Sequence, residues 1–160
     1  MKGRRAQGWG FDLAIALMIF SAVLFLFFFY ILNYSPEADK NLADMNSEAD
    51  SISNLILSEG RPIDWNPSNV QEIGILTGKK INETKLHNFF NISTDNYNLT
   101  KSLLKINYEY FINFSETIYS NGILISEIGK KPIESQYLSK SSRQTIYNNK
   151  PITIYFEVWK

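Results

Sequence analysis

The chain has 160 residues, about the length of one ordinary domain, and it contains 16 Lys+Arg and 16 Asp+Glu, so its formal net charge is +0. A nucleic-acid-binding protein that depends on bulk positive charge is therefore not expected. Cysteine is absent and histidine occurs once, as His87, which excludes disulfides, thiol chemistry and zinc sites built from cysteine or several histidines.

The first element is a long apolar segment near the N-terminus. Residues 13–32 read LAIALMIFSAVLFLFFFYIL, without a charged side chain. Twenty residues at about 1.5 Å each cover the roughly 30 Å of a membrane's hydrocarbon core. The apolar core of a secretory signal is shorter, about 7–15 residues. We therefore expect a retained transmembrane helix.

Charges on its two sides orient this helix. Lys2, Arg4 and Arg5 precede it, whereas acidic residues predominate just after it. The positive-inside rule then places the N-terminus in the cytoplasm and residues 34–160 outside. An outside domain without cysteine fits a prokaryotic surface better than a eukaryotic disulfide scaffold.

An amphipathic stem helix is expected next. Ser35 and Pro36 suit its N-cap and first position, and Gly60 followed by Pro62 suits its end. Alternatively, the chain stays helical through Pro36 with a kink. Its apolar stripe recurs at alternating spacings of four and three residues: Ala38, Leu42, Met45, Ala49, Ile52 and Ile56.

The stem and the rest of the outer part differ in net charge. Residues 34–60 contain six Asp+Glu and one Lys, a net −5, whereas residues 61–160 contain nine Asp+Glu and twelve Lys+Arg, a net +3. A solvated helix face beside an ordinary domain surface would explain this difference. Alternatively, acidic stems of one subunit meet basic heads of the next, because complementary patches favour docking and register.

The remaining chain predicts a small antiparallel sheet of about four strands. After helical or irregular structure over 82–105, a period of two from Ile106 to Phe114 marks a half-buried strand. Asn121-Gly122 predicts a turn into a second strand around residues 123–125. Residues 144–147 and 152–159 predict a hairpin, and residues 129–142 a loop.

One face of this sheet is apolar and needs a cover, which the stem stripe supplies. The fold class is therefore α+β, with a long N-terminal helix packed on the sheet. We expect four segments: a basic leader and processing region over 1–12, a transmembrane helix over 13–32, an amphipathic stem over 33–60 and an outer α+β head over 61–160.

Four Asn-x-Ser/Thr sequons lie in the predicted outer head. They make Asn82, Asn91, Asn98 and Asn113 candidate N-glycosylation sites, and a fifth sequon begins at Asn33.

The order of a basic leader, small residues, an apolar helix, an amphipathic continuation and a sheet resembles the type IV pilin superfamily, and archaeal type IV pilin-like proteins in particular. The resemblance covers essentially the whole chain. The start, Lys2-Gly3-Arg4-Arg5-Ala6-Gln7-Gly8-Trp9-Gly10-Phe11-Asp12-Leu13, is similar to their class III signal peptide. Gly60-x-Pro62-x-Asp64-Trp65, Ile73-Gly74-Ile75-Leu76, residues 143–147 and Val158-Trp159 are similar to later segments of uncharacterised archaeal members.

This resemblance implies that a membrane-embedded prepilin peptidase removes the leader on the cytoplasmic side and leaves the helix in place. The cut would follow Ala6, Gly8 or Gly10. The processing region is thus Ala6, Gln7, Gly8, Trp9, Gly10 and Phe11.

Family members commonly carry a glutamate at the fifth mature position, where it neutralises the terminal amine of a neighbouring subunit. That position here is Phe11, Leu13 or Ile15 for the three cuts, none of them acidic. Asp12 is the nearby carboxylate and so the candidate assembly residue; its alternative role is a favourable charge in the first turn of the helix. The departure favours a minor or pilin-like subunit over a major pilin.

An enzyme is not expected. His87 stands beside apolar residues, and the chain has no Ser/His/Asp arrangement, phosphate-binding glycine loop or H-E-x-x-H helix. The stem acids lack the spacing of a calcium loop. We predict no catalytic residue, cofactor or metal site.

The expected function is a pilin or pilin-like structural subunit of an archaeal cell-surface filament, assembling through its N-terminal helix. Its expected partners are the membrane, a prepilin peptidase and other pilin subunits, in a homo- or hetero-polymer, without a nucleic acid or small-molecule substrate. The alternative is a monomeric, signal-anchored extracellular protein with a partner-binding or envelope role.

Overall fold

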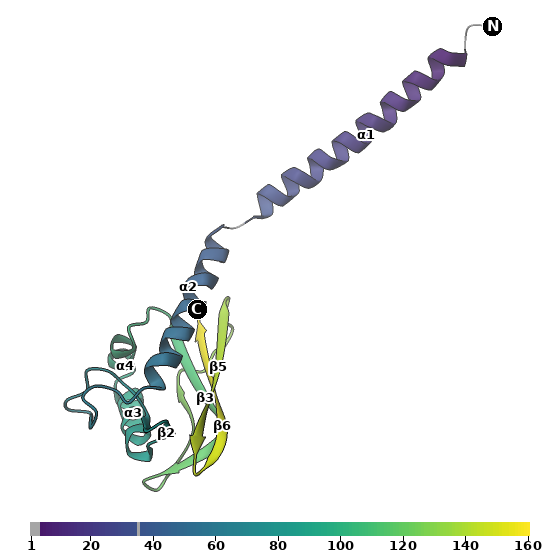
Figure 1. Cartoon of the computed structure of the whole chain (residues 1–160). Helices are drawn as coiled ribbons and strands as arrows, with labels where there is room; N and C mark the ends of the chain where they lie inside the picture. Colours follow the sequence, from purple (N-terminus) through teal and green to yellow (C-terminus); the bar gives the residue numbers. More distant parts are fainter. Residues whose placement is uncertain (1–3, 35) are drawn as a thin grey trace. The chain divides into compact units, whose positions relative to one another are not determined.

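The computed structural model describes residues 4–34 and 36–160, with side chains described over 9–34 and 40–160. The chain divides into two compact units, Met1–Ala38 and Asp39–Lys160. The first contains helix α1 (Arg4–Asn33), and most of helix α2 (Pro36–Ile56) belongs to the second (Figure 1). Pro36 is the first residue of α2, as one of the two alternatives predicts. The predicted N-cap, Ser35, lies outside the described residues.

The second unit continues with two short strands, two helices and four longer strands. They are β1 (Leu76–Thr77), β2 (Lys80–Ile81), α3 (Glu83–Asp95), α4 (Tyr97–Leu104), β3 (Glu109–Ser120), β4 (Ile123–Gly129), β5 (Leu138–Tyr147) and β6 (Lys150–Trp159). The strands form one curled sheet in the order β1-β2-β5-β6-β3-β4, and α2 and α3 lie on one side of it (Figure 1).

The predicted α+β class is confirmed, but the prediction of a small antiparallel sheet of about four strands is wrong. The sheet has six strands and is mixed, because β2 pairs with β5 in parallel through Lys80 and Ile146. The pairs β3–β4, β3–β6 and β5–β6 are antiparallel. β1 and β2 have two residues each, which is too short to show a period-two pattern in the sequence.

Strand β5 begins at Leu138, inside the segment predicted as a loop. Its inward-facing residues are polar because they meet the polar side of α2 rather than the apolar stripe. The Ser141 hydroxyl donates to Asp50 Oδ1 at 3.0 Å, and Arg143 Nη2 donates to the same oxygen at 2.9 Å. Serines in place of apolar residues remove the alternation by which a half-buried strand is recognised.

Two hairpins of the second unit close through two-residue turns. Asn121 and Gly122 have φ of 48° and 85°, and Asn148 and Asn149 have φ of 48° and 61°. Positive φ at both positions matches the right-handed twist of the paired strands, and asparagine and glycine tolerate it best. The predicted Asn121-Gly122 turn is confirmed.

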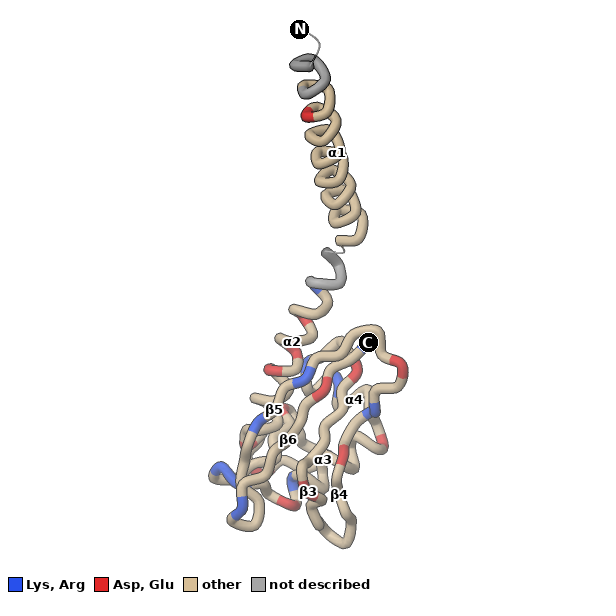
Figure 2. The backbone as a smooth tube through the Cα atoms, turned by 90° about the vertical axis from the view of Figure 1, so that its right-hand side faces the viewer, with Lys and Arg blue, Asp and Glu red and all other residues tan. Residues whose placement is uncertain are grey.

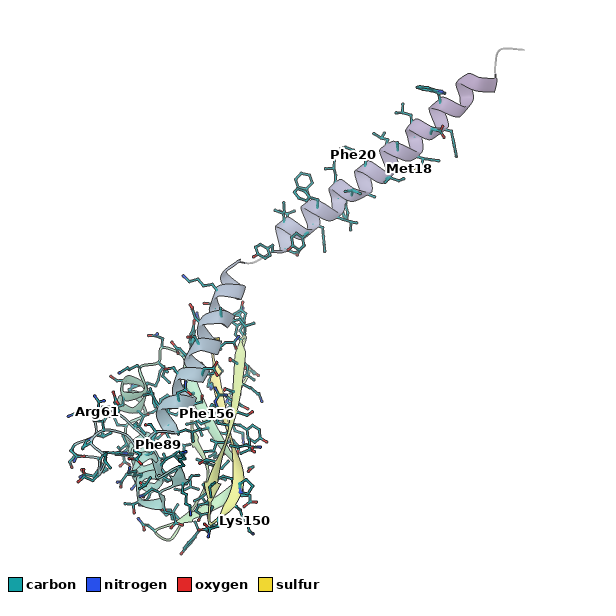
Figure 3. All side chains as sticks on the ribbon, viewed as in Figure 1. Met18, Phe20, Arg61, Phe89, Lys150 and Phe156 are labelled. Carbon is teal, nitrogen blue, oxygen red and sulfur yellow. The ribbon has the colours of Figure 1, made fainter. Side chains whose placement is uncertain are left out.

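The core of the second unit lies between α2, α3 and the sheet. Of the predicted stem stripe, Met45, Ala49, Ile52 and Ile56 are at most 1% exposed, whereas Leu42 is 42% exposed. The side chain of Ala38 lies outside the described residues. The predicted inner face of β6 is also confirmed, since Ile152, Ile154, Phe156 and Val158 are buried. Figure 3 labels Phe156 and Phe89 of α3 in this interior.

The segment predicted as helical or irregular over 82–105 is helical for most of its length, as α3 and α4. The Asn82 side chain caps α3 by accepting the Lys85 backbone N–H at 3.1 Å. Asn96 ends α3 and caps α4, where its side chain accepts the Leu99 N–H at 3.0 Å. Lys105 then closes α4 in a left-handed conformation.

Candidate functional site

The surface of α1 is the feature that most needs a functional explanation. Every described side chain from Trp9 to Tyr34 is exposed, and nearly all of them are apolar. Within the described residues, one helix, Trp9–Asn33, is long and apolar enough to cross a membrane. At about 1.5 Å per residue, its 25 residues exceed the roughly 30 Å of a hydrocarbon core.

Aromatic side chains stand at both ends of this segment. Trp9 is 84% exposed at one end. At the other end, the rings of Tyr30 and Tyr34 stack with centroids 6.0 Å apart. Trp9 and Tyr30 are separated by about 32 Å along the helix axis. Tryptophan and tyrosine concentrate at the two water interfaces of a bilayer, so this spacing suits a membrane span.

The predicted processing region falls within the first turns of α1. Trp9, Gly10, Phe11 and Asp12 are helical and exposed, and a Cβ added to Gly10 would have no atom within 4 Å. Ala6, Gln7 and Gly8 are helical too, but their side chains are not described. Gly8 and Gly10 each weaken a helix interior by about 0.5–1 kcal/mol relative to alanine.

Asp12 is the acidic side chain in the described part of α1, and Figure 2 shows that this part is otherwise nearly free of charge. No described side chain forms an ion pair with it. An exposed carboxylate among apolar side chains is a candidate for contact with a cation or an amine of another molecule.

The four predicted glycosylation asparagines have different surroundings. Asn98 and Asn113 are exposed, in α4 and β3, whereas Asn82 and Asn91 are half-buried. Asn82 is also occupied as the cap of α3, and its Nδ2 donates to the Thr77 hydroxyl at 3.2 Å. Asn98 and Asn113 are therefore the two that have room for a bulky glycan.

Two acidic residues of the stem bind the head of their own chain. Glu48 accepts the backbone N–H of Asn107 at 3.1 Å and that of Tyr108 at 3.3 Å. Asp50 forms an ion pair with Arg143 at 2.9 Å. These contacts hold α2 against the start of β3 and the middle of β5, so part of the stem's negative charge is structural.

The segment Gly60 to Gly74, singled out by its resemblance to other chains, forms a tight packed loop. Gly60 has φ of +74°, and the Trp65 indole Nε1 donates to the Gly74 carbonyl at 2.8 Å. A Cβ added to Gly74 would lie 2.3 Å from the Gly60 nitrogen and 2.5 Å from the Ser58 carbonyl oxygen. The motif thus serves packing below α2, and Trp65 is 2% exposed.

A buried lysine that the sequence did not reveal holds this loop to α3. Lys85 is 5% exposed, and its Nζ donates to the carbonyl oxygens of Glu59 at 2.7 Å and Leu76 at 3.0 Å. Its sequence neighbours, Lys-Leu-His-Asn, give no sign of burial. A lysine whose ammonium is enclosed by carbonyl groups is a structural staple.

A tyrosine pair joins α4 to β3. The rings of Tyr97 and Tyr110 stack with centroids 4.9 Å apart, and the Tyr110 hydroxyl contacts Ser93 at 2.9 Å and Thr100 at 2.7 Å. Burial raises the pKa of both phenols above their ordinary value. Burial pushes the pKa of Glu109 upward, but the Lys101 ammonium 3.1 Å away, the Tyr97 hydroxyl and Lys130 together hold that pKa below its ordinary value.

His87 lies half-buried on α3, and its Nδ1 has no hydrogen-bond partner in the described chain. Among the side chains described over 9–34 and 40–160, no three His, Asp or Glu form a group that could hold a metal ion. Comparisons with protein-family models, with curated proteins and with solved structures found no match for this chain.

Proposed function

We propose that this chain is a pilin-like structural subunit of an archaeal cell-surface filament, and that it assembles through α1. The observation that carries the proposal is the uncovered apolar surface of α1, attached to a second unit that has its own closed core. A helix that is apolar all round is stable in lipid or among other helices, and not in water. Its aromatic ends and the stem acids suit a chain that crosses a membrane with its head outside.

In this proposal a prepilin peptidase cuts between Ala6 and Phe11 and removes Lys2, Arg4 and Arg5. The charges that hold the N-terminus at the cytoplasmic face are then lost, so α1 can leave the bilayer. Moving its apolar surface from lipid to other copies of α1 is nearly neutral for apolar area. Packing fit and a contact of Asp12 with a neighbouring N-terminal amine must therefore favour the filament.

The proposal assigns each segment of the chain a place relative to the membrane. Residues 1–12 form the leader and processing region, 13–32 the membrane helix, 33–60 the stem and 61–160 the head, outside the cell. If the chain is a glycoprotein, Asn98 and Asn113 are the expected acceptors because both are exposed.

The experiment is the intact mass of the chain recovered from membranes with and without an active archaeal prepilin peptidase. Loss of the first six, eight or ten residues is expected, and the mass identifies the cut. A peptidase with its catalytic aspartates replaced provides the control. A chain that keeps its full mass where a known pilin is cut would contradict the proposal.

The second candidate is a monomeric, signal-anchored extracellular protein. The contacts of Glu48 and Asp50 with their own head favour it, since they leave less of the stem free for neighbours. The two candidates differ in their response to Asp12→Lys. A filament subunit would keep its folded head and lose assembly, whereas an anchored monomer would have no assembly to lose.

A further inference from the structure

Two tight turns bring three lysines together at one end of the second unit. Gly78 and Lys79 form the turn between β1 and β2, and Asn148 and Asn149 form the turn between β5 and β6. The parallel pairing of β2 with β5 puts these turns side by side, and Lys80 Nζ donates to Asn149 Oδ1 at 2.9 Å. Lys79, Lys80 and Lys150 are all exposed, and we call them the lysine cluster. Figure 3 labels Lys150 at this end.

The charges of the lysine cluster are not neutralised within the described chain, where no ion pair includes any of the three. Two carboxylates border the cluster, and each accepts a hydrogen bond from a neutral group rather than pairing with one of the three lysines. Glu59 accepts the Gly78 N–H at 3.0 Å, and Glu83 accepts the Tyr147 hydroxyl at 3.0 Å.

The backbone fixes where Lys79 stands. Its φ is 68°, and Gly78 before it has φ of 57°, as the two-residue turn between β1 and β2 requires. This turn holds Lys79 at the end of the unit, beside Lys80.

An acidic surface, whose charge is opposite to that of the lysine cluster, lies at the other end of the same unit. A cleft of about 710 Å³ has Asp44, Ser47 and Glu48 of α2 on one side. Its other lining residues are Asn107, Tyr108, Glu109, Trp159 and Lys160, so the acidic part of the cleft is its α2 side. Glu109 in this cleft pairs with Lys101 and Lys130. Asp44 and Glu48 have no lysine or arginine partner among the ion pairs of the described residues.

The two surfaces cannot meet within one chain. Strand β6 runs from Lys150, in the lysine cluster, to Trp159, in the wall of the cleft. Ten strand residues at about 3.3 Å each separate them by about 30 Å. Each surface also has an exposed apolar side chain nearby: Ile146, the pairing partner of Lys80, is 39% exposed, and Leu42, near Asp44, is 42% exposed.

We infer that the lysine cluster of one copy docks on the Asp44–Glu48 side of α2 in a second copy of this chain. The inference rests on the proposed function, because it names the head-to-stem contact of that assembly. Joining two different surfaces of identical chains gives a head-to-tail contact, which repeats into an open polymer. Opposite charges set the register of such a contact, and the attraction between them weakens as salt is added.

The test is sedimentation velocity of the full chain in an uncharged detergent, which covers α1 and leaves association to the heads. Lys79→Glu/Lys80→Glu/Lys150→Glu is compared with Arg61→Glu/Lys105→Glu/Lys131→Glu, which makes the same charge change elsewhere on the unit. The wild type and the matched control should associate at low salt and dissociate at high salt. The cluster variant should associate about tenfold more weakly.

A charge exchange makes the test specific. Asp44→Lys alone should weaken association, and mixing it with the cluster variant should restore it, because glutamates then face a lysine. Glu48 is left intact since it also holds Asn107 and Tyr108.

A wild-type chain that stays monomeric in detergent, or a cluster variant that associates like wild type, would overturn the docking. Retention of the wild type on double-stranded DNA through the cluster, without self-association, would equally overturn it. Loss of the leader would still be seen in the intact mass, so this failure is distinct from failure of the proposed function.

Discussion

Helices α1 and α2 follow each other in the chain but bury their side chains to opposite extents. From Trp9 to Tyr34 every described side chain of the first unit is exposed, whereas Met45, Ala49, Ile52 and Ile56 of α2 are closed off from water. The difference shows which apolar surface a single chain can cover. The stripe of α2 belongs to the core of the head, while the apolar side chains of α1 stay exposed.

The largest expected difference between α1 and α2 is the effect of deleting each helix on the folding of the head. A chain that starts at Asp39 should fold, because the second unit keeps its whole described core. A chain that starts at Ser58 loses Met45, Ile52 and Ile56 and should not fold. Cooperative thermal unfolding followed by circular dichroism checks both chains, and an unfolded chain from Asp39 would contradict the comparison.

Replacing a glycine should affect the stability of the head differently in the two units. Gly74→Ala forces a Cβ to 2.3 Å from the Gly60 nitrogen, so we expect the free energy of unfolding of the head to fall by about 4 kcal/mol or more. Gly10→Ala, where nothing lies within 4 Å, should leave the unfolding of the head unchanged. Urea unfolding of both variants in detergent tests this, and equal effects would refute it.

A smaller difference in stability is expected between the same substitution of one isoleucine in each helix. Ile52→Ala removes a side chain that is 1% exposed and should cost about 2–5 kcal/mol of head stability. Ile19→Ala removes one that is 61% exposed and should cost the head nothing. The measurement is the shift of the urea midpoint at constant slope. A loss in Ile19→Ala as large as that in Ile52→Ala would mean that α1 is part of the same folding unit.

The smallest expected effect is on alkaline stability. Burial raises the pKa of Tyr97 and Tyr110 above the ordinary 10.0. The stability that the two neutral phenols give to the head is therefore fully present below pH 10.0, and it is lost as the pH rises above that value. Each phenol can remove up to about 1.4 kcal/mol per pH unit in that range. Urea unfolding from about pH 8 to about pH 11 should show the decline, and Tyr97→Phe should flatten it. A flat wild-type profile would contradict the burial of the pair.

The sequence predicted those parts of the fold in which apolar residues meet apolar residues. The α2 stripe, the inner face of β6 and the Asn121-Gly122 turn follow from periodicity and turn chemistry. Strand β5 was predicted only over residues 144–147, because the inner residues of its first part bind the polar side of α2, so Ser141 and Arg143 resemble a loop. Leu42 was placed in the stripe but is 42% exposed, beyond the last turn of α2 that the head covers.

Of the candidate site, the apolar span and its aromatic ends could be read from the sequence, since they are properties of one continuous segment. The lysine cluster could not be predicted in the same way. Lys80 and Lys150 lie 70 positions apart in the sequence and meet through a parallel pairing of a two-residue strand.

In the proposed filament, other copies of α1 cover its exposed surface. The chain has no cysteine, so a single cysteine introduced at Met18 or at Phe20 is the only thiol that can form a disulfide between subunits. Oxidation of each variant in surface fractions, after peptidase processing, should give disulfide-linked dimers between subunits. Asp12→Lys in the same variants should abolish them. Monomers at both positions, in fractions where the leader has been removed, would show that lipid alone covers α1 and would contradict the account.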